Sequence, residues 1–199
     1  MIMSGTQSVS LPVVVADKVL DVPHIRQEQD LWCWAACAQM VANFYNPDNT
    51  GTQSAMVKCA HNNTLNRRGG ADDIIKIITE YGKKTLTKVT RSNFGGETSL
   101  RQKLDSGKPV IYLSNRVNSE GETKGHYRVI YGYYKQSDNK YVYLIYDPWD
   151  PVKYANNSHF DYWRRSWQNI LDEEDIGISG IDKLPKSGFT NYSGDWFIY

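Results

Sequence analysis

The stretch RQEQDLWCWAAC at residues 26–37 decides the fold, because a cysteine lies there between two tryptophans and is followed at once by small residues. From Cys33 to Phe44 the apolar positions recur every three or four residues, which predicts one buried face of an α-helix. The helix is expected to end ahead of Pro47, because proline disfavours a helical residue before it. One of only three cysteines therefore stands at the first turn of a buried helix.

Cys33 occupies a position that favours an anion. Unpaired backbone N–H groups and the positive end of the helix dipole stabilise a thiolate there, which lowers the pKa of the thiol. Gln29 or Asp30 is expected to cap the helix, and Cys37 lies one turn deeper, away from any cleft. A cysteine that merely fills the core would look the same, since free cysteine is among the most buried residue types. Whether Cys33 is a reactive thiol or a core residue therefore depends on whether the other groups of a thiol active site are present.

A thiol nucleophile needs a general base and a group that orients the base. His126 follows a glycine at the start of the run HYRVIYGYY, and Asp147 follows the run YVYLIY. If these runs are antiparallel strands joined by the polar turn KQSDNK, the start of the first lies beside the end of the second. That topology brings His126 and Asp147 together. The alternatives are a surface or core histidine and a plain turn aspartate.

The loop before the helix supplies a candidate oxyanion donor. Gln27 lies in this loop, and its side-chain amide is expected to join the Cys33 backbone N–H in binding a developing oxyanion. Gln29 is the rival for this role, and a solvated loop glutamine is the third interpretation.

The rest of the sequence predicts an α+β fold in which helices come first and strands follow. Helices are expected at 53–60 after a Thr52 cap, at 72–81 with Gly82 as the stop, and at 99–104 between Thr98 and Gly107; strands are expected at 84–90, 109–114, 126–134 and 140–146, with the tail DWFIY closing the sheet. We expect a single domain over 1–199, with a helical lobe at about 21–82 and an antiparallel β lobe at about 83–199.

The composition excludes several classes of binding partner. With 23 basic and 22 acidic residues spread along the chain, the net charge of +1 gives no footprint for nucleic acid or an anionic membrane. Three cysteines are too few for a disulfide scaffold and leave at least one free thiol, and four scattered histidines predict no metal site. No signal peptide or transmembrane segment is predicted in the sequence.

Taken together, the motifs resemble those of the papain-like cysteine proteases. The closest likeness is to the avirulence-effector proteases of plant-pathogenic bacteria and to the related bacteriocin-processing peptidase-like group. The stretches that carry it are VPHIRQEQDLWCWAACAQMV at 22–41, SGKPVIYL at 106–113, GHYRVIYGY at 125–133 and YLIYDPW at 143–149.

The resemblance implies a papain-like two-lobe fold and a cysteine endopeptidase that needs no cofactor. It makes Cys33 the nucleophile, His126 the general base and then the acid, Asp147 the orienting residue and Gln27 the oxyanion donor. Trp149 falls two residues after the orienting group, where papain-type enzymes place a tryptophan that shields the histidine's hydrogen bond from water. The implied partner is a protein or peptide substrate, the expected state is a monomer, and export or injection as an effector is the implied route.

Three features depart from papain itself. His126 follows Cys33 at a shorter interval than the ~130 to 150 residues found in papain and the cathepsins, and the signature around the papain cysteine is absent. Papain uses asparagine where Asp147 stands. Two other functions stay open: deamidation or acyl transfer by the same triad, and a silent binding module that uses the Tyr- and Trp-rich tail at 154–199.

Overall fold

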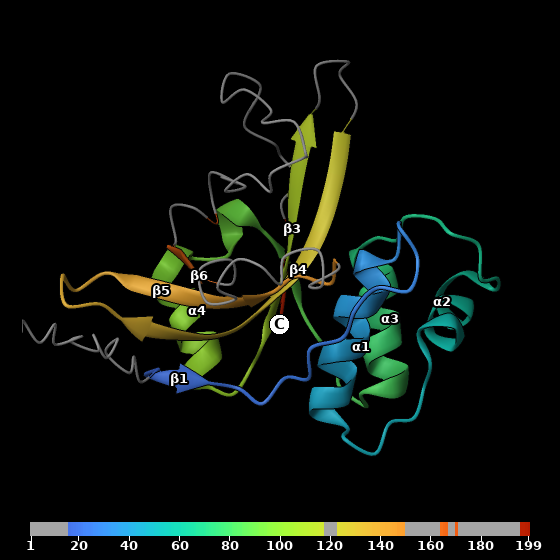
Figure 1. Ribbon diagram of the computed structural model, residues 1–199, viewed down its shortest axis with the longest axis horizontal. Helices are drawn as coiled ribbons and strands as arrows, with labels where there is room; N and C mark the ends of the chain where they lie inside the picture. Colours follow the sequence, from blue (N-terminus) through green and yellow to red (C-terminus); the bar gives the residue numbers. More distant parts are fainter. Residues whose placement is uncertain (1–15, 118–122, 150–163, 167–169, 171–195) are drawn as a thin grey trace, which may run out of the picture.

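The computed structural model describes residues 16–117, 123–149, 164–166, 170 and 196–199. Three helices gather on one side of the molecule and an antiparallel sheet extends from them on the other, with the fourth helix against the sheet (Figure 1). The helices are α1 (Cys33–Tyr45), α2 (Gln53–His61), α3 (Ala71–Tyr81) and α4 (Gly96–Asp105), with a 3-10 helix η1 (Arg91–Asn93). The predicted α+β class, with an N-terminal helical lobe and a C-terminal antiparallel β lobe, is confirmed.

The sheet is antiparallel at every pairing among the described residues. Its strands are β1 (Lys18–Val19), β2 (Lys88–Thr90), β3 (Val110–Val117), β4 (Thr123–Lys135), β5 (Tyr141–Tyr146), β6 (Arg164–Ser166) and β7 (Trp196–Ile198). They run in the order β2-β7-β3-β4-β5-β6, with β1 added on β4. The prediction that the C-terminal tail joins the sheet is confirmed, because β7 lies between β2 and β3.

Helix α1 is the centre of the core. It packs against α3 and β4, and its residues from Cys33 to Ala38 are all buried. Helix α3 ends at Gly82 as predicted, but Gly82 has an ordinary φ of −85°. A Cβ there would lie 3.0 Å from the Cα of Ala42 and 2.8 Å from the carbonyl oxygen of Ile78. Glycine is therefore needed for the close approach of α1 and α3 rather than for a left-handed turn.

Four predicted elements differ from the structure by three or four residues at one end. Strand β3 continues to Val117 instead of ending at residue 114, and β4 begins at Thr123 instead of residue 126. The strand expected at 84–90 is shortened to β2, and α4 begins at Gly96 rather than after Thr98. Gly95 precedes α4 with a φ of +86°, which glycine adopts without strain, and the neighbouring Phe94 stacks on Phe197 of β7 at 4.1 Å. The helix starts early because this stack and the glycine turn fix the chain ahead of it. The Thr52 cap is confirmed, since its hydroxyl accepts the Ala55 N–H at 3.2 Å.

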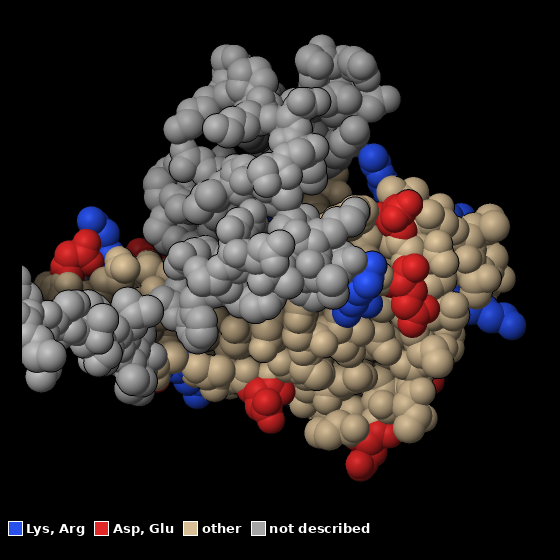
Figure 2. Space-filling model, viewed as in Figure 1, with Lys and Arg blue, Asp and Glu red and all other residues tan. Residues whose placement is uncertain are grey.

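The surface carries both signs of charge. On the face shown in Figure 2, acidic and basic side chains are both present over the helical side of the molecule. None of the described helices is both long enough and apolar enough to cross a membrane. Most of the 154–199 tail that the binding-module alternative needs lies outside the described residues.

Candidate active site

Cys33 is the first residue of α1, as the sequence predicts. The predicted cap is wrong: Trp32 precedes the helix, and no side chain caps it. Gln29 and Asp30 instead turn their backbone carbonyls toward Gln27, and the Gln29 carbonyl also accepts the Trp32 N–H at 3.0 Å. The first N–H groups of α1 are therefore left to other acceptors, which include the Cys33 sulfur itself.

His126 connects the nucleophile to a carboxylate. It lies on β4, and its Nε2 is 2.7 Å from Oδ1 of Asp147, which follows the end of β5. The other ring nitrogen is left for Cys33, whose side chain hydrogen-bonds to the imidazole. The antiparallel pairing of β4 and β5 brings His126 beside Asp147, and the packing of α1 against β4 adds Cys33 to the same line of contacts. The His126 and Asp147 side chains are 25% and 23% exposed, so this line is mostly shielded from water.

The charges at the site favour a thiolate and an imidazolium. Burial acts to raise the pKa of the Cys33 thiol, but the hydrogen bond and charge of His126 outweigh it, and the pKa is lowered. Burial acts to lower the pKa of His126, yet the Asp147 carboxylate raises it to about 9. The pKa of Asp147 is held well below its usual range, because His126 and Arg128 outweigh the effect of burial. By contrast, burial raises the pKa of Cys37 well above that of an ordinary thiol.

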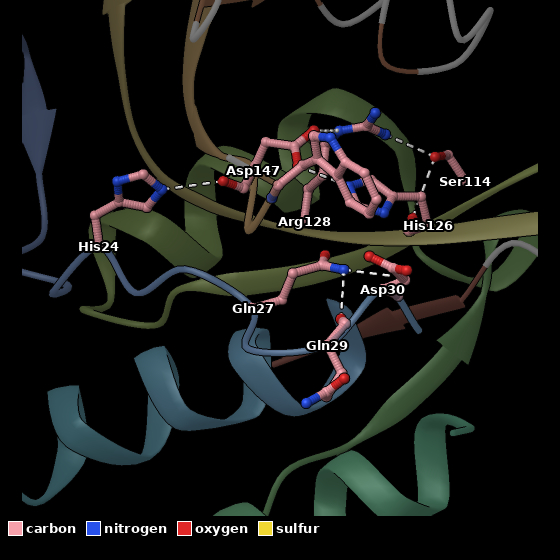
Figure 3. Close-up of polar contacts among 9 residues, drawn as sticks. His24, Gln27, Gln29, Asp30, Ser114, His126, Arg128 and Asp147 are labelled. Atoms are coloured by element: carbon pink, nitrogen blue, oxygen red, sulfur yellow. Dashed lines mark hydrogen bonds and ion pairs between the residues drawn. The ribbon is translucent and has the colours of Figure 1, made fainter. Parts of the chain in front are cut away.

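The Asp147 carboxylate has further partners that the sequence alone did not identify (Figure 3). Arg128 donates Nε–H to Oδ2 at 2.7 Å, and the Trp149 backbone donates to Oδ1 at 2.8 Å. Arg128 also donates to Oγ of Ser114, and His24 bonds to the Asp147 carbonyl at 3.0 Å. Strand alternation was the missed signal, because a residue two positions after His126 must share its face of the sheet.

Gln27 lies below this line, on the loop that enters α1 (Figure 3). Its Nε2 donates to the carbonyls of Gln29 at 2.8 Å and of Asp30 at 2.9 Å, so both amide hydrogens are engaged within the loop. Its Oε1 is buried without a hydrogen-bond partner among the described residues. The Gln27 backbone N–H donates to the carbonyl of Pro148 at 2.8 Å, which ties the loop to the residue after Asp147.

A buried glutamine of α2 fixes the backbone on both sides of Gln27. The Gln53 side chain, which is fully buried, accepts the Glu28 N–H at 2.9 Å and donates to the Arg26 carbonyl at 3.0 Å. Its amide also donates to the side-chain oxygen of Gln39 on α1 at 3.1 Å. The loop that carries Gln27 is thereby attached to the helical lobe, while the Pro148 contact attaches it to the β lobe.

The two tryptophans beside Cys33 hold the loop between α2 and α3. Trp32 Nε1 donates to the Leu65 carbonyl at 3.2 Å, and Trp34 Nε1 donates to the Arg67 carbonyl at 3.1 Å. Gly69 packs flat on the Trp34 ring, where a Cβ would approach to 2.3 Å. The aromatic residues around Cys33 therefore position a neighbouring loop as well as filling the core.

No group of three or more His, Cys, Asp or Glu side chains within the described parts of the chain is arranged to hold a metal ion. Cys33, Cys37 and Cys59 are all free thiols. The arrangement is that of a thiol with an imidazole and a carboxylate behind it, which suits nucleophilic chemistry at a carbonyl.

Comparison with known families agrees with this chemistry. The model of the Peptidase_C39 like family matches residues 19–173, a range that includes Gln27, Cys33, His126 and Asp147. The chain belongs to this family. The family is one of papain-like cysteine peptidases.

Solved structures similar to this member of the Peptidase_C39 like family include the crystal structure of UfSP from C. elegans. The two share 12% sequence identity with a TM-score of 0.48, and the likeness covers 97% of this chain and 35% of that one. The chain thus spans 35% of the length of that protein. Among curated proteins, none matches the chain.

Proposed function

We propose that the protein is a cysteine endopeptidase that works through a Cys33–His126–Asp147 triad and an acyl-enzyme intermediate. The observation that carries the proposal is the continuous line of hydrogen bonds from the Cys33 thiol through the His126 ring to the Asp147 carboxylate. A buried thiol with a lowered pKa beside an imidazole that holds its proton is the state that a thiol peptidase needs at rest.

In the proposed reaction the Cys33 sulfur attacks the peptide carbonyl carbon and forms a C–S bond, and the carbonyl oxygen becomes an oxyanion. The His126 proton then passes to the leaving nitrogen as the C–N bond breaks, which gives an acyl-enzyme and a free amine. Water, deprotonated by His126, attacks the thioester carbon and forms a C–O bond; the C–S bond then breaks, the acyl group leaves as a carboxylic acid, and the Cys33 sulfur returns to its resting state beside the protonated His126. Asp147 keeps the ring oriented throughout and stabilises its positive charge.

The proposed oxyanion donors are the Cys33 backbone N–H and the Gln27 side chain. Support for Gln27 comes from its place beside the entrance to α1 and from the contacts that hold its backbone on both lobes. Because both of its amide hydrogens are donated to loop carbonyls, the amide must release one of them when substrate binds. Trp149 is proposed to shield the His126–Asp147 hydrogen bond, since its backbone already bonds to the same carboxylate oxygen.

We further propose a single domain over 1–199, a monomer that acts on protein or peptide substrates, and a bacterial exported or injected effector. Strand β7 from the C-terminal end pairs with β2 and β3 from the middle of the chain, which supports the single domain. The effector role rests on the motif resemblance alone.

Incubation of the purified protein with a defined mixture of synthetic peptides, followed by mass spectrometry, tests the activity. Cleaved peptides that appear with wild type and with Cys59→Ala, but are absent with Cys33→Ala, would support the proposal. A gain of about one dalton at glutamine would instead identify a deamidase, and peptides joined to an added amine would identify an acyltransferase. Unchanged peptides would contradict the peptidase proposal and favour the binding module.

A further inference from the structure

The Asp147 carboxylate is shared between two cationic side chains. Oδ1 faces His126 Nε2 and Oδ2 accepts the Arg128 Nε–H, each at 2.7 Å. The guanidinium is fixed at a second point, because its Nη1 donates to Ser114 Oγ at 2.8 Å. The Arg128 side chain is only 16% exposed, so little water screens its charge from the carboxylate. Figure 3 shows Asp147 with Arg128, His126 and Ser114 next to it.

The strand pairing explains why these groups meet. Arg128 is two residues after His126 on β4, which places both side chains on one face of the sheet. Ser114 of β3 pairs directly with His126, and its hydroxyl donates to the His126 carbonyl at 3.2 Å. On the other side of β4, Val129 pairs with Tyr146, so Asp147 comes next to Arg128. The arginine is therefore held by both neighbouring strands.

The charge of Arg128 bears on how strong an acid His126 is. Burial acts to lower the pKa of His126, the Asp147 carboxylate raises it, and the Arg128 guanidinium lowers it, with a result of about 9. An imidazolium that faces an unopposed carboxylate holds its proton more tightly and is a weaker general acid. In papain-type enzymes with asparagine at this place no such charge exists; here Asp147 brings one, and Arg128 opposes it.

We propose that Arg128 is a positioning residue that fixes the Asp147 carboxylate and offsets its charge, so that the His126 imidazolium stays acidic enough to protonate the leaving amine. The step it serves rests on the proposed peptidase function. In that step the C–N bond of the tetrahedral intermediate breaks, a Cys33 thioester forms, and the His126 proton moves to the departing nitrogen, leaving a neutral imidazole. Arg128 touches none of the reacting atoms.

The first test does not need a substrate. The pKa of His126 is measured by NMR titration of the full chain labelled at histidine, in wild type, Arg128→Met and Arg128→Lys. We expect the pKa to rise in Arg128→Met and to rise less in Arg128→Lys, which keeps the charge. An unchanged His126 pKa in Arg128→Met would overturn the proposal.

The double variant Arg128→Met with Asp147→Asn removes both charges at once and guards against misfolding of the single variant. We expect the pKa of His126 in the double variant to lie at or below the wild-type value, because nothing then favours the imidazolium. A pKa above the wild-type value in this variant would show that Arg128 acts on His126 by some route other than Asp147, which contradicts the proposal.

The second test compares two leaving groups on one acyl part, benzyloxycarbonyl-glycine p-nitrophenyl ester and the matching p-nitroanilide. The phenolate leaves without a proton, whereas the aniline needs one. We expect Arg128→Met to lower the anilide-to-ester ratio of kcat/KM about tenfold or more. An equal fall for both substrates would mean a purely structural role. If wild type cleaves neither substrate, the peptidase proposal is weakened, while the titration still decides the role of Arg128.

Discussion

Replacing Asp147 by asparagine tests how far the carboxylate charge maintains the active thiol. The substitution keeps the size of the side chain and an oxygen for His126, but it removes the negative charge. The pKa of His126 is about 9 with Asp147 present, against about 6.5 for an ordinary histidine. That difference corresponds to about 3 kcal/mol in favour of the imidazolium. Burial acts in the opposite direction, and the Asp147 charge is the largest of the effects that raise the pKa of His126.

We therefore expect the pKa of His126 to fall to about 7 or below in Asp147→Asn. With less imidazolium beside it, the Cys33 thiolate loses its main stabilising partner, and its pKa moves up toward that of an ordinary thiol. An asparagine amide also presents a donor toward Arg128 or His126, which weakens one of the two contacts. The rate of Cys33 alkylation at pH 6 is expected to fall about tenfold or more.

The assay is the rate of iodoacetamide labelling of Cys33 from pH 5 to pH 10, followed by mass spectrometry. Asp30→Asn is the matched control, because Asp30 contributes only a backbone carbonyl to the site. The control should follow the wild-type profile. A profile in Asp147→Asn that coincides with wild type would show that the carboxylate charge has no part in activating the thiol.

Four further results are expected. Gln53→Leu leaves the backbone groups on either side of Gln27 without their partner and should lower the free energy of unfolding in urea by about 1 to 3 kcal/mol for each group left unpaired; a loss under about 0.5 kcal/mol would show that water replaces it. Gln27→Ala should lower kcat/KM for peptides about tenfold or more while iodoacetamide labelling stays unchanged, and a parallel loss of both would assign Gln27 a structural role. Cys37→Ala should leave the rate of Cys33 labelling unchanged, because Cys37 is fully buried and the pKa of its thiol is raised. A slower rate of Cys33 labelling in a variant that is still folded would contradict this expectation. Because the folded-state pKa of His126 is raised, its contribution to stability is complete below about pH 6.5 and is lost as pH rises through about 9; urea unfolding should therefore show a decline over this window that His126→Ala removes.

The sequence predicts most of the fold because its elements have strong local signals. The period of α1, the Thr52 cap and the alternating strands around His126 and Asp147 all follow from neighbouring residues. The errors arise where tertiary contacts decide. The start of α4 depends on Phe94 stacking on the C-terminal strand. The missing side-chain cap on α1 is the exception, because it accompanies a local contact in which Gln27 binds the carbonyls of Gln29 and Asp30.

The candidate site was likewise predicted where local signals exist and missed where contacts are distant in the chain. Antiparallel pairing predicted from the turn between two strands is enough to place His126 beside Asp147. Arg128 and Gln53 were missed because their importance depends on distance: Arg128 meets Asp147 across a strand pair, and Gln53 reaches a loop 25 residues away in the chain. For Arg128 the sequence held one local signal, the strand alternation that puts it on the same face as His126, whereas for Gln53 a single sequence offers none.

The proposed function depends above all on the activation of Cys33 by His126. It is tested most directly by labelling the protein with iodoacetamide or E-64 at neutral pH and mapping the modified cysteine, in wild type and in His126→Ala. We expect fast labelling confined to Cys33 that collapses in the variant, with the partly exposed free thiol of Cys59 as the internal reference. Slow labelling of Cys33 at a rate that does not depend on His126 would show that Cys33 is only a buried thiol of the core and is not activated by His126.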